Sequence, residues 1–220
     1  LIDLKKKINK NIYNMYYYQQ KRILDLISAI LLTIIFLPIW IIVPIMIYID
    51  SGFPIIFKHK RVGFNGKEFY LYKFRSMIPN AEAILHEQNK ELLKKFRKGD
   101  WKLENDPRIT KLGKALRSLT IDEFPQIYNV IKGEMSMIGP RAYVLKELNE
   151  QVKKYPKTKK YKKMILSVKP GITGPWQTSG RNEIPFDKRA KMDAEYAQQK
   201  SIIKDIIIML KTPKAMISKW

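Results

Sequence analysis

Residues 23–49 read ILDLISAILLTIIFLPIWIIVPIMIYI, and this apolar run decides what kind of fold the chain can adopt. Asp25 is its only charged residue. The hydrocarbon core of a bilayer takes about 20 helical residues, so the run predicts a membrane segment. A secretory signal has a shorter apolar core and a small-residue cleavage site, and neither is present here. A buried core helix is the alternative, although such a helix seldom lacks a polar face over so many turns.

Prolines and flanking charges argue against a simple crossing of the membrane. Pro38 and Pro44 lie inside the run, where each removes a backbone donor and is expected to kink a helix. Basic residues flank the run on both sides: Lys5, Lys6, Lys7, Lys10, Lys21 and Arg22 before it, and Lys58, Lys60 and Arg61 after it. Because basic residues prefer the cytoplasmic side, this pattern favours a re-entrant hairpin that bends at Pro38 over a tilted crossing.

The overall composition limits the partners and ligands. The 220 residues include 42 Lys and Arg against 20 Asp and Glu, a formal net charge of +22. Such a charge attracts polyanions, namely nucleic acid, anionic lipid headgroups or phosphorylated substrates. The chain has no cysteine, so disulfides and thiolate-bound metals are excluded.

Beyond residue 50 the sequence predicts a small β-hairpin followed by helices. Residues 54–58 and 67–74 have strand character, and Gly63-Phe64-Asn65-Gly66 between them is a turn signal. Helical patterns follow at residues 78–98, 145–166, 186–199 and 202–220. Lysines interrupt every apolar cluster of the last pattern, which favours an amphipathic helix lying in the membrane interface.

The stretch TIDEFPQ at residues 120–126 holds the acidic pair Asp122 and Glu123. Pro125 is tolerated in a helix only near its first turn, so a helix should start close to this pair. Thr120 and Glu123 have the spacing of a capping box. In that structural interpretation the two carboxylates only complement a helix N-terminus.

Two arginines give the acidic pair a second interpretation. Arg117 precedes Asp122 by five residues, and Gly139-Pro140-Arg141 follows the predicted helix. The guanidinium fork matches phosphate oxygens, and helix N-terminal amides bind anions, so the region could hold a diphosphate. A divalent cation on the carboxylates would neutralise it, and an Asp oxygen could then attack phosphorus. A structural cluster of salt bridges fits the same spacing.

The motifs as a set resemble the bacterial sugar transferase family, the monotopic phosphoglycosyl transferases that begin lipid-linked glycan assembly. The matching stretches are KRILD at 21–25, KRVG at 60–63, YKFRSM at 72–77, NDPRIT at 105–110, LR at 116–117, DEFPQ at 122–126, NVIKGEMS at 129–136, GPR at 139–141, KPGITG at 169–174 and QTSGR at 177–181. They follow the order of the family from residue 21 onward.

The resemblance implies roles for the polar residues around residue 122. Asp122 corresponds to the catalytic nucleophile and Glu123 to its partner, with Mg²⁺ bound by this pair. Arg117 and Arg141 correspond to phosphate-binding arginines, and Pro38 to the break of a re-entrant hairpin. Two positions differ from the common pattern: Leu37 replaces a frequent Ser, and Ala142 replaces a frequent Pro.

The implied reaction transfers a sugar-1-phosphate from a UDP-sugar to polyprenyl (undecaprenyl) phosphate and releases UMP. A ping-pong mechanism through a phosphosugar on Asp122 is expected, at the start of surface polysaccharide or glycoconjugate assembly. Membrane lipids are expected partners, nucleic acid is not, and a homodimer is left open. The expected place is the bacterial inner membrane, with the catalytic domain on its cytoplasmic face.

The predicted fold class is therefore α/β, mostly helical with a small β-hairpin. A re-entrant membrane hairpin of two helices carries a cytosol-facing catalytic domain with interfacial amphipathic helices. We expect an N-terminal interfacial segment at residues 1–20, the membrane hairpin at 21–50 and the catalytic domain at 51–220.

Two further groups of residues have less specific signals. A basic group on the predicted hairpin could hold the lipid phosphate, or could be solvated surface: Lys58, Lys60, Arg61, Lys73 and Arg75. A polar turn could contact the nucleotide or sugar, or could be structural: Gln177, Gly180 and Arg181.

Two other functions compete with this one. The charge also suits a non-catalytic basic protein bound to membranes or nucleic acid, although no base-reading module is recognisable. A phosphate site of this kind could also take a nucleotide-activated alcohol as donor, as in phospholipid headgroup transfer.

Overall fold

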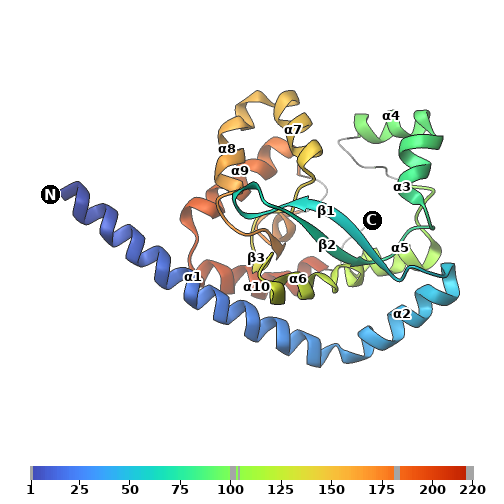
Figure 1. Cartoon of the computed structure of the whole chain (residues 1–220), viewed down its shortest axis with the longest axis horizontal. Helices are drawn as coiled ribbons and strands as arrows, with labels where there is room; N and C mark the ends of the chain where they lie inside the picture. Colours follow the sequence, from blue (N-terminus) through green and yellow to red (C-terminus); the bar gives the residue numbers. More distant parts are fainter. Residues whose placement is uncertain (1, 100–102, 104, 181–183, 217–220) are drawn as a thin grey trace.

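A computed structural model describes residues 2–99, 103, 105–180 and 184–216 of the chain. The apolar run forms most of two helices, α1 (Ile2–Ile35) and α2 (Leu37–Ser51), which meet at Phe36. Together they make a shallow arc along one side of the molecule, and the remaining elements lie on the inner side of this arc (Figure 1).

The break between α1 and α2 has a local cause. Phe36 leaves the helical region with φ −101° and ψ 24°, and Pro38, which has no N–H, lies in the first turn of α2. Residues 12–35 and 37–51 are bent by 64° against each other. Leu37 stands where a Ser is frequent in the family, so no hydroxyl is available at that position of the break. The Thr33 hydroxyl does not take its place, because it donates to the Ala29 carbonyl at 2.8 Å, one turn before the break. The bend predicted near Pro38 is confirmed.

The outer surface of the arc is apolar. Among the described residues, no single helix has the length and apolarity of a membrane span, whereas the bent pair together has both. Exposed aliphatic side chains cover its outer surface: Ile23, Ile27, Ile30, Leu31, Ile34, Ile35, Leu37, Ile41, Ile42, Ile45 and Ile49. Ala29, Val43 and Ile47 on the inner surface are buried against the domain. A continuous apolar patch of this kind is typical of a membrane-binding surface, and the re-entrant topology stays a prediction.

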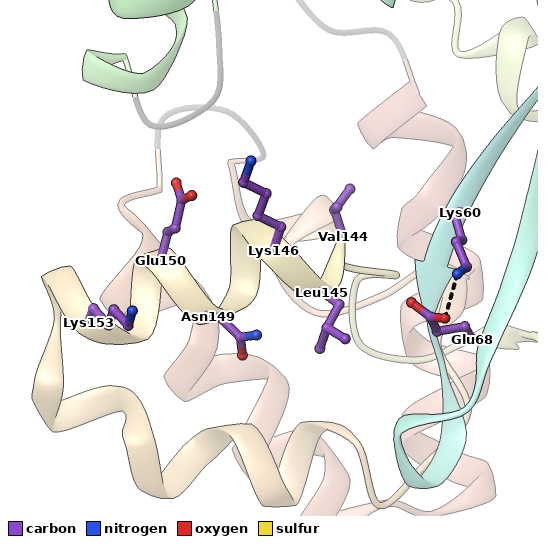
Figure 2. Close-up of a pocket in the computed structure, with 8 residues that line it drawn as sticks. All are labelled: Lys60, Glu68, Val144, Leu145, Lys146, Asn149, Glu150 and Lys153. Carbon is purple, nitrogen blue, oxygen red and sulfur yellow. Dashed lines mark ion pairs between the residues drawn. The ribbon is translucent and has the colours of Figure 1, made fainter. Parts of the chain in front are cut away.

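The predicted hairpin is present, and its first strand is longer than expected. β1 (Ile56–Val62) pairs antiparallel with β2 (Glu68–Phe74), and the turn at Phe64–Gly66 places Asn65 at φ 54°. Lys60 and Arg61 therefore belong to a strand. Lys60 forms an ion pair with Glu68 at 2.7 Å on the outer face, beside a shallow groove of about 490 Å³ along α7 (Leu145–Lys154) (Figure 2).

The rest of the domain is mostly short helices. The helix predicted at residues 78–98 is divided into α3 (Ala81–Ala83), a π-helical turn (Ile84–Gln88) and α4 (Lys90–Lys98). The helix predicted at 145–166 is divided near Pro156 into α7, a 3₁₀ turn (Pro156–Thr158) and α8 (Lys159–Ile165). The other helices are α5 (Lys111–Ser118), α6 (Gln126–Lys132), α9 (Phe186–Gln199) and α10 (Ile202–Met216).

Close backbone contacts hold these elements together. β3 (Ser136–Ile138) and β4 (Gly171–Thr173) form a short parallel pair. A β-carbon on Gly139 or Gly171 would overlap the backbone of the other segment, so both positions depend on the small size of glycine. Asn129 of α6 is fully buried; its amide donates to the Tyr70 carbonyl at 2.7 Å and accepts from the Tyr72 N–H at 3.1 Å, which joins α6 to β2.

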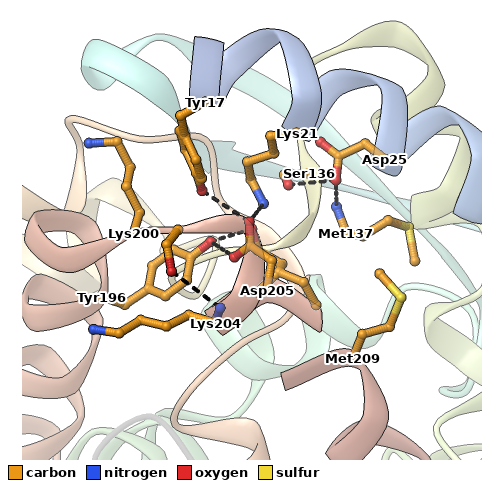
Figure 3. A network of polar contacts seen from close by, with 12 residues as sticks. Tyr17, Lys21, Asp25, Ser136, Met137, Tyr196, Lys200, Lys204, Asp205 and Met209 are labelled. Carbon is orange, nitrogen blue, oxygen red and sulfur yellow. Dashed lines mark hydrogen bonds and ion pairs between the residues drawn. The ribbon is translucent and has the colours of Figure 1, made fainter. Parts of the chain in front are cut away.

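Three residues of α1 fasten this helix to the domain, and Figure 3 shows two of them, Lys21 and Asp25. Lys21 forms an ion pair with the fully buried Asp205 of α10 at 2.9 Å. Arg22 donates to the last carbonyls of α6, at 2.6 Å to Val130 and 2.8 Å to Ile131. Asp25 accepts from the Ser136 hydroxyl at 2.8 Å and from the Met137 N–H at 2.9 Å.

Asp205 also accepts from the hydroxyls of Tyr17 at 3.0 Å and Tyr196 at 2.5 Å. All three of its donors are buried. The sequence analysis expected α10 to lie in the membrane interface, and this stays a prediction: Asp205 of its first turn is buried in the domain, while Ile203, Ile207 and Leu210 are exposed.

We predict that Asp205→Asn lowers the free energy of unfolding by about 3–5 kcal/mol, because it leaves the buried Lys21 ammonium without a counter-charge. Urea unfolding of the detergent-solubilised chain measures this. Asp187→Asn is the matched control, because Asp187 is exposed in the first turn of α9 and its loss should cost no more than about 1 kcal/mol. Equal losses for the two variants would contradict the anchoring role of Asp205.

Candidate active site

Asp122 and Glu123 lie on a tight 3₁₀ turn (Ile121–Glu123) between α5 and α6. Asp122 is 6% exposed. Thr120, which precedes the turn, adopts a left-handed conformation with φ 60°, and its hydroxyl donates to the Met216 carbonyl of α10 at 3.0 Å. The capping-box interpretation is therefore wrong, because Thr120 caps no backbone N–H of this turn.

Lys73 of β2 bridges the two carboxylates. Its ammonium lies 2.6 Å from Glu123 Oε1 and 3.7 Å from Asp122 Oδ2. Burial raises the pKa of Asp122, and the Lys73 ammonium opposes this shift. The sequence analysis placed Lys73 in a group that could hold the lipid phosphate or be solvated surface; in the structure its ammonium lies at the acidic pair.

Arg117 reaches the same site from α5. Thr110 caps the start of this helix by accepting from the Gly113 N–H at 2.9 Å. A β-carbon on Gly113 would overlap the Ser76 carbonyl, so this glycine allows α5 to approach the end of β2. Arg117 Nε donates to Ser76 Oγ at 2.8 Å. Burial lowers the pKa of Arg117, and the nearby Asp122 carboxylate opposes that shift.

Arg141 follows β3, where the backbone crosses at Gly139 and Gly171. Its N–H donates to Asp193 Oδ2 at 3.2 Å, and its guanidinium lies 5.1 Å from the ring centre of Trp176. Its Nε is buried and has no hydrogen-bond partner among the described residues. The Arg141 guanidinium therefore retains capacity to bind an anion. Burial raises the pKa of the neighbouring Asp193 to about 7.

Arg61 and His59 of β1 lie near Arg141. Arg61 donates to the Ala142 carbonyl at 3.1 Å, and its other terminal nitrogen lies 3.1 Å from His59 Nδ1. Burial and the neighbouring Arg141 lower the pKa of Arg61 to about 10. Burial, with Arg61 and Lys73, lowers the pKa of His59 to about 3, so its ring is neutral at physiological pH and can accept from Arg61.

The predicted lipid-phosphate group is divided between two faces of the hairpin. Phe57 is opposite Lys73 in the register, so Arg61 shares the face of Lys73. Lys58 and Lys60 are on the opposite face, where Lys58 Nζ lies 5.9 Å from the Tyr72 ring centre. Arg75 turns toward the end of α2, donating to Ser51 Oγ at 2.8 Å and to the Gly52 carbonyl at 2.6 Å.

The polar turn after β4 is partly described. Gln177 donates to the Ile172 carbonyl at 3.4 Å, and its side-chain oxygen is buried without a partner in the described ranges. Gly180 has φ 129°, a conformation that other residues rarely adopt. Arg181 lies outside the described residues.

The acidic pair fits part of a Mg²⁺ site. Within the described part of the chain, no group of three or more His, Asp and Glu side chains could hold a metal by itself. Asp122 and Glu123 already attract one cation, the Lys73 ammonium, and carboxylate oxygens are ligands that Mg²⁺ prefers. Mg²⁺ usually keeps water and substrate phosphate oxygens as its remaining ligands, so two carboxylates are sufficient protein donors.

Three residues near the site were not predicted for it: His59, Trp176 and Asp193. Strand alternation could have placed His59 on the Lys73 face once the register was known. Trp176 and Asp193 meet Arg141 only through tertiary contacts, for which the sequence has no local signal.

The family model for bacterial sugar transferases matches residues 16–219. The chain is 40% identical over 201 residues to an undecaprenyl-phosphate galactose phosphotransferase of Salmonella typhimurium, covering 90% of this chain and 40% of the relative. It is 44% identical over 216 residues to galactosyl transferase CpsE of Streptococcus agalactiae, covering 93% and 45%. It is 37% identical over 200 residues to exopolysaccharide production protein ExoY of Sinorhizobium fredii, covering 89% and 84%.

The chain thus spans less than half the length of the first two relatives and most of the length of the third. The family model covers nearly the whole chain, from the first anchoring residues of α1 to the end of α10. The chain belongs to the bacterial sugar transferase family.

Proposed function

We propose that the protein transfers a sugar-1-phosphate from a UDP-sugar to undecaprenyl phosphate, forming a polyprenyl-diphosphate sugar and UMP. One observation carries the proposal: a buried carboxylate, Asp122, lies beside the cations of Lys73 and Arg117. A relative with 40% identity is named as an undecaprenyl-phosphate galactose phosphotransferase, which supports the same class of substrates.

The proposed mechanism has two displacements at phosphorus. A carboxylate oxygen of Asp122 attacks the β-phosphorus of the UDP-sugar, an O–P bond forms, and the bond to the α-phosphate oxygen breaks to release UMP. A phosphate oxygen of the polyprenyl phosphate then attacks the phosphosugar on Asp122 and frees the carboxylate. Each step exchanges one phosphate linkage for another, so no further energy source is needed.

The cationic side chains have separate roles in this scheme. Arg117 and Arg141 bind the diphosphate oxygens and stabilise the charge that develops at the transition state. Lys73 keeps Asp122 ionised despite its burial, and Glu123 holds Lys73 at 2.6 Å. A Mg²⁺ ion held by Asp122 and Glu123 would supply further charge neutralisation and substrate orientation.

Membrane attachment explains how a lipid acceptor reaches this site. We propose that the exposed apolar surface of α1 and α2 enters the cytoplasmic membrane as a re-entrant hairpin, with the domain on the cytoplasmic face. The arc lies along the full width of the domain (Figure 1), so a polyprenyl chain in the bilayer could present its phosphate at the membrane surface.

We predict that Asp122→Asn abolishes catalysis, because the amide is a far weaker nucleophile than the carboxylate. UMP release is measured from a panel of UDP-sugars with Mg²⁺ and undecaprenyl phosphate. A CDP-activated alcohol, which would release CMP instead, is tested as the alternative donor. We expect a loss of roughly 10³-fold or more with one UDP-sugar, and Asp187→Asn as a control with wild-type turnover. Equal activity of Asp122→Asn and wild type would remove Asp122 as the nucleophile.

A further prediction concerns the pH dependence of turnover. The nucleophile must be ionised, and its pKa is raised by burial, so turnover should fall as the pH drops through a value above the ordinary Asp pKa of about 3.9. Lys73 opposes the shift, so Lys73→Met should move this acidic limb to higher pH.

Lys60→Met is the matched control, because Lys60 is on the opposite face of the hairpin and pairs with Glu68. The measurement is the pH profile of kcat/KM for each variant. A limb that stays in place or moves to lower pH in Lys73→Met would contradict the role given to Lys73.

A further inference from the structure

A cavity of about 440 Å³ lies between the middle of α1 and the domain. Its walls come from α1, the turn at Phe64–Gly66, β3, the segment before β4, and α9 with the residue after it. None of the residues proposed for catalysis, Asp122, Glu123, Arg117 and Arg141, is among those that line it. Some of its lining residues appear in Figure 3 around the Asp205 network.

The cavity has more positive than negative charge. Four cationic side chains line it: Lys21, Arg22, Lys169 and Lys200. Two carboxylates face them, Asp25 on the wall and Asp205 behind Lys21. Asp205 is paired with Lys21, and the partners of Asp25 are the Ser136 hydroxyl and the Met137 N–H. An excess of positive charge is therefore left beside Arg22 and Lys169.

The positive charge of Arg22 is not neutralised by its hydrogen-bond partners, because both are backbone carbonyls. Its two terminal nitrogens donate to the carbonyls of Val130 and Ile131 at the end of α6. Carbonyl oxygens carry only the partial negative charge of a helix C-terminus, which compensates less than a carboxylate would. The guanidinium is thus fixed in position, and none of the described residues gives it a counter-ion.

Lys169 is the second uncompensated cation. Its ammonium and the Arg22 guanidinium both lie within 4 Å of the point where a β-carbon on Gly133 would be, so the two charges are close neighbours. Lys169 has no hydrogen-bond or ion-pair partner within the described part of the chain. Burial and the adjacent Arg22 lower the pKa of Lys169, and the Asp25 carboxylate opposes this shift without cancelling it.

The position of the cavity on α1 indicates the source of an anion. From Ile23 onward the exposed large residues of α1 are all aliphatic, whereas before it exposed tyrosines, Tyr13, Tyr16 and Tyr18, alternate with Ile12 and Met15. Interfacial tyrosines and the start of an apolar surface mark the level of lipid headgroups. Tyr18 and Arg22 line the cavity, so it opens at this level.

Capping of α6 explains Arg22 but does not explain Lys169. Arg22 already donates to the exposed carbonyls at the end of α6, and Lys169 donates to none of them. A phosphate diester carries one full negative charge and free oxygens, and it would satisfy both cations through charge-assisted hydrogen bonds.

We propose that this cavity binds the phosphate group of an anionic phospholipid headgroup, held between Arg22 and Lys169. Such a site would fix the depth and orientation of α1 at the membrane surface, separately from any donor or acceptor in the catalytic site. This inference rests on the proposed membrane association of α1 and not on the proposed catalysis.

The test is titration calorimetry of the detergent-solubilised chain, without a nucleotide sugar, using dioctanoyl phosphatidylglycerol, dioctanoyl phosphatidylcholine or inorganic phosphate as the probe. We expect saturable binding of phosphatidylglycerol at one site, stronger than that of phosphatidylcholine. Lys169→Gln should weaken it roughly tenfold, as expected for the loss of one charge-assisted hydrogen bond. Lys163→Gln makes the same charge change on an exposed residue outside the cavity and should leave it unchanged.

The result separates the sources of the anion. Equal affinity for inorganic phosphate, with the same sensitivity to Lys169→Gln, would support a phosphate site but overturn its assignment to lipid. No saturable binding to the wild-type chain, or equal weakening by Lys163→Gln, would overturn the site itself. Lys169→Arg retains the charge and should retain binding, which controls for damage to the fold; circular dichroism checks each variant.

Discussion

The attachment of α1 to the domain through Lys21, Arg22 and Asp25 is the constraint on which the rest of the structure depends. These residues lie within two turns of helix and contact three separate elements, α10, the end of α6 and β3. Because α6 follows the turn of Asp122 directly, the same contacts fix the acidic pair relative to the apolar surface of the arc. The proposed reaction between a soluble nucleotide sugar and a membrane lipid needs the acidic pair at a defined position relative to that surface.

The catalytic proposal depends on a balance between burial and charge. Burial alone would favour the protonated form of Asp122, which is a poor nucleophile. Lys73 and Arg117 oppose this: Lys73 is held by Glu123, and Arg117 is positioned by its bond to Ser76, where Gly113 allows α5 to approach. Arg141 is placed in the same way by the crossing of Gly139 and Gly171 and by its contacts with Trp176 and Asp193. Glycines thus permit the close backbone contacts that position Arg117 beside Asp122 and Arg141 beside Trp176 and Asp193.

The sequence predicted those features that have a local signal. The apolar run and Pro38 predicted the bent helix pair, and turn residues predicted the hairpin. Pro156 and the π-helical turn divided helices whose apolar spacing looked continuous, because periodicity does not reveal where backbone hydrogen bonding changes. The meeting of Lys73 with Glu123, and of Lys21 with Asp205, joins residues far apart in the chain. Only the packed fold determines such pairs, so the sequence analysis did not connect Lys73 with the acidic pair and overlooked Asp205.

The covalent intermediate is the most direct test of the account. The solubilised chain is incubated with Mg²⁺ and its UDP-sugar in the absence of lipid acceptor, quenched in acid, and analysed by intact and peptide mass spectrometry. The account predicts one phosphosugar adduct, located on Asp122, that disappears when undecaprenyl phosphate is added before the quench. Rapid lipid-dependent turnover with no adduct, or an adduct on another residue, would contradict it.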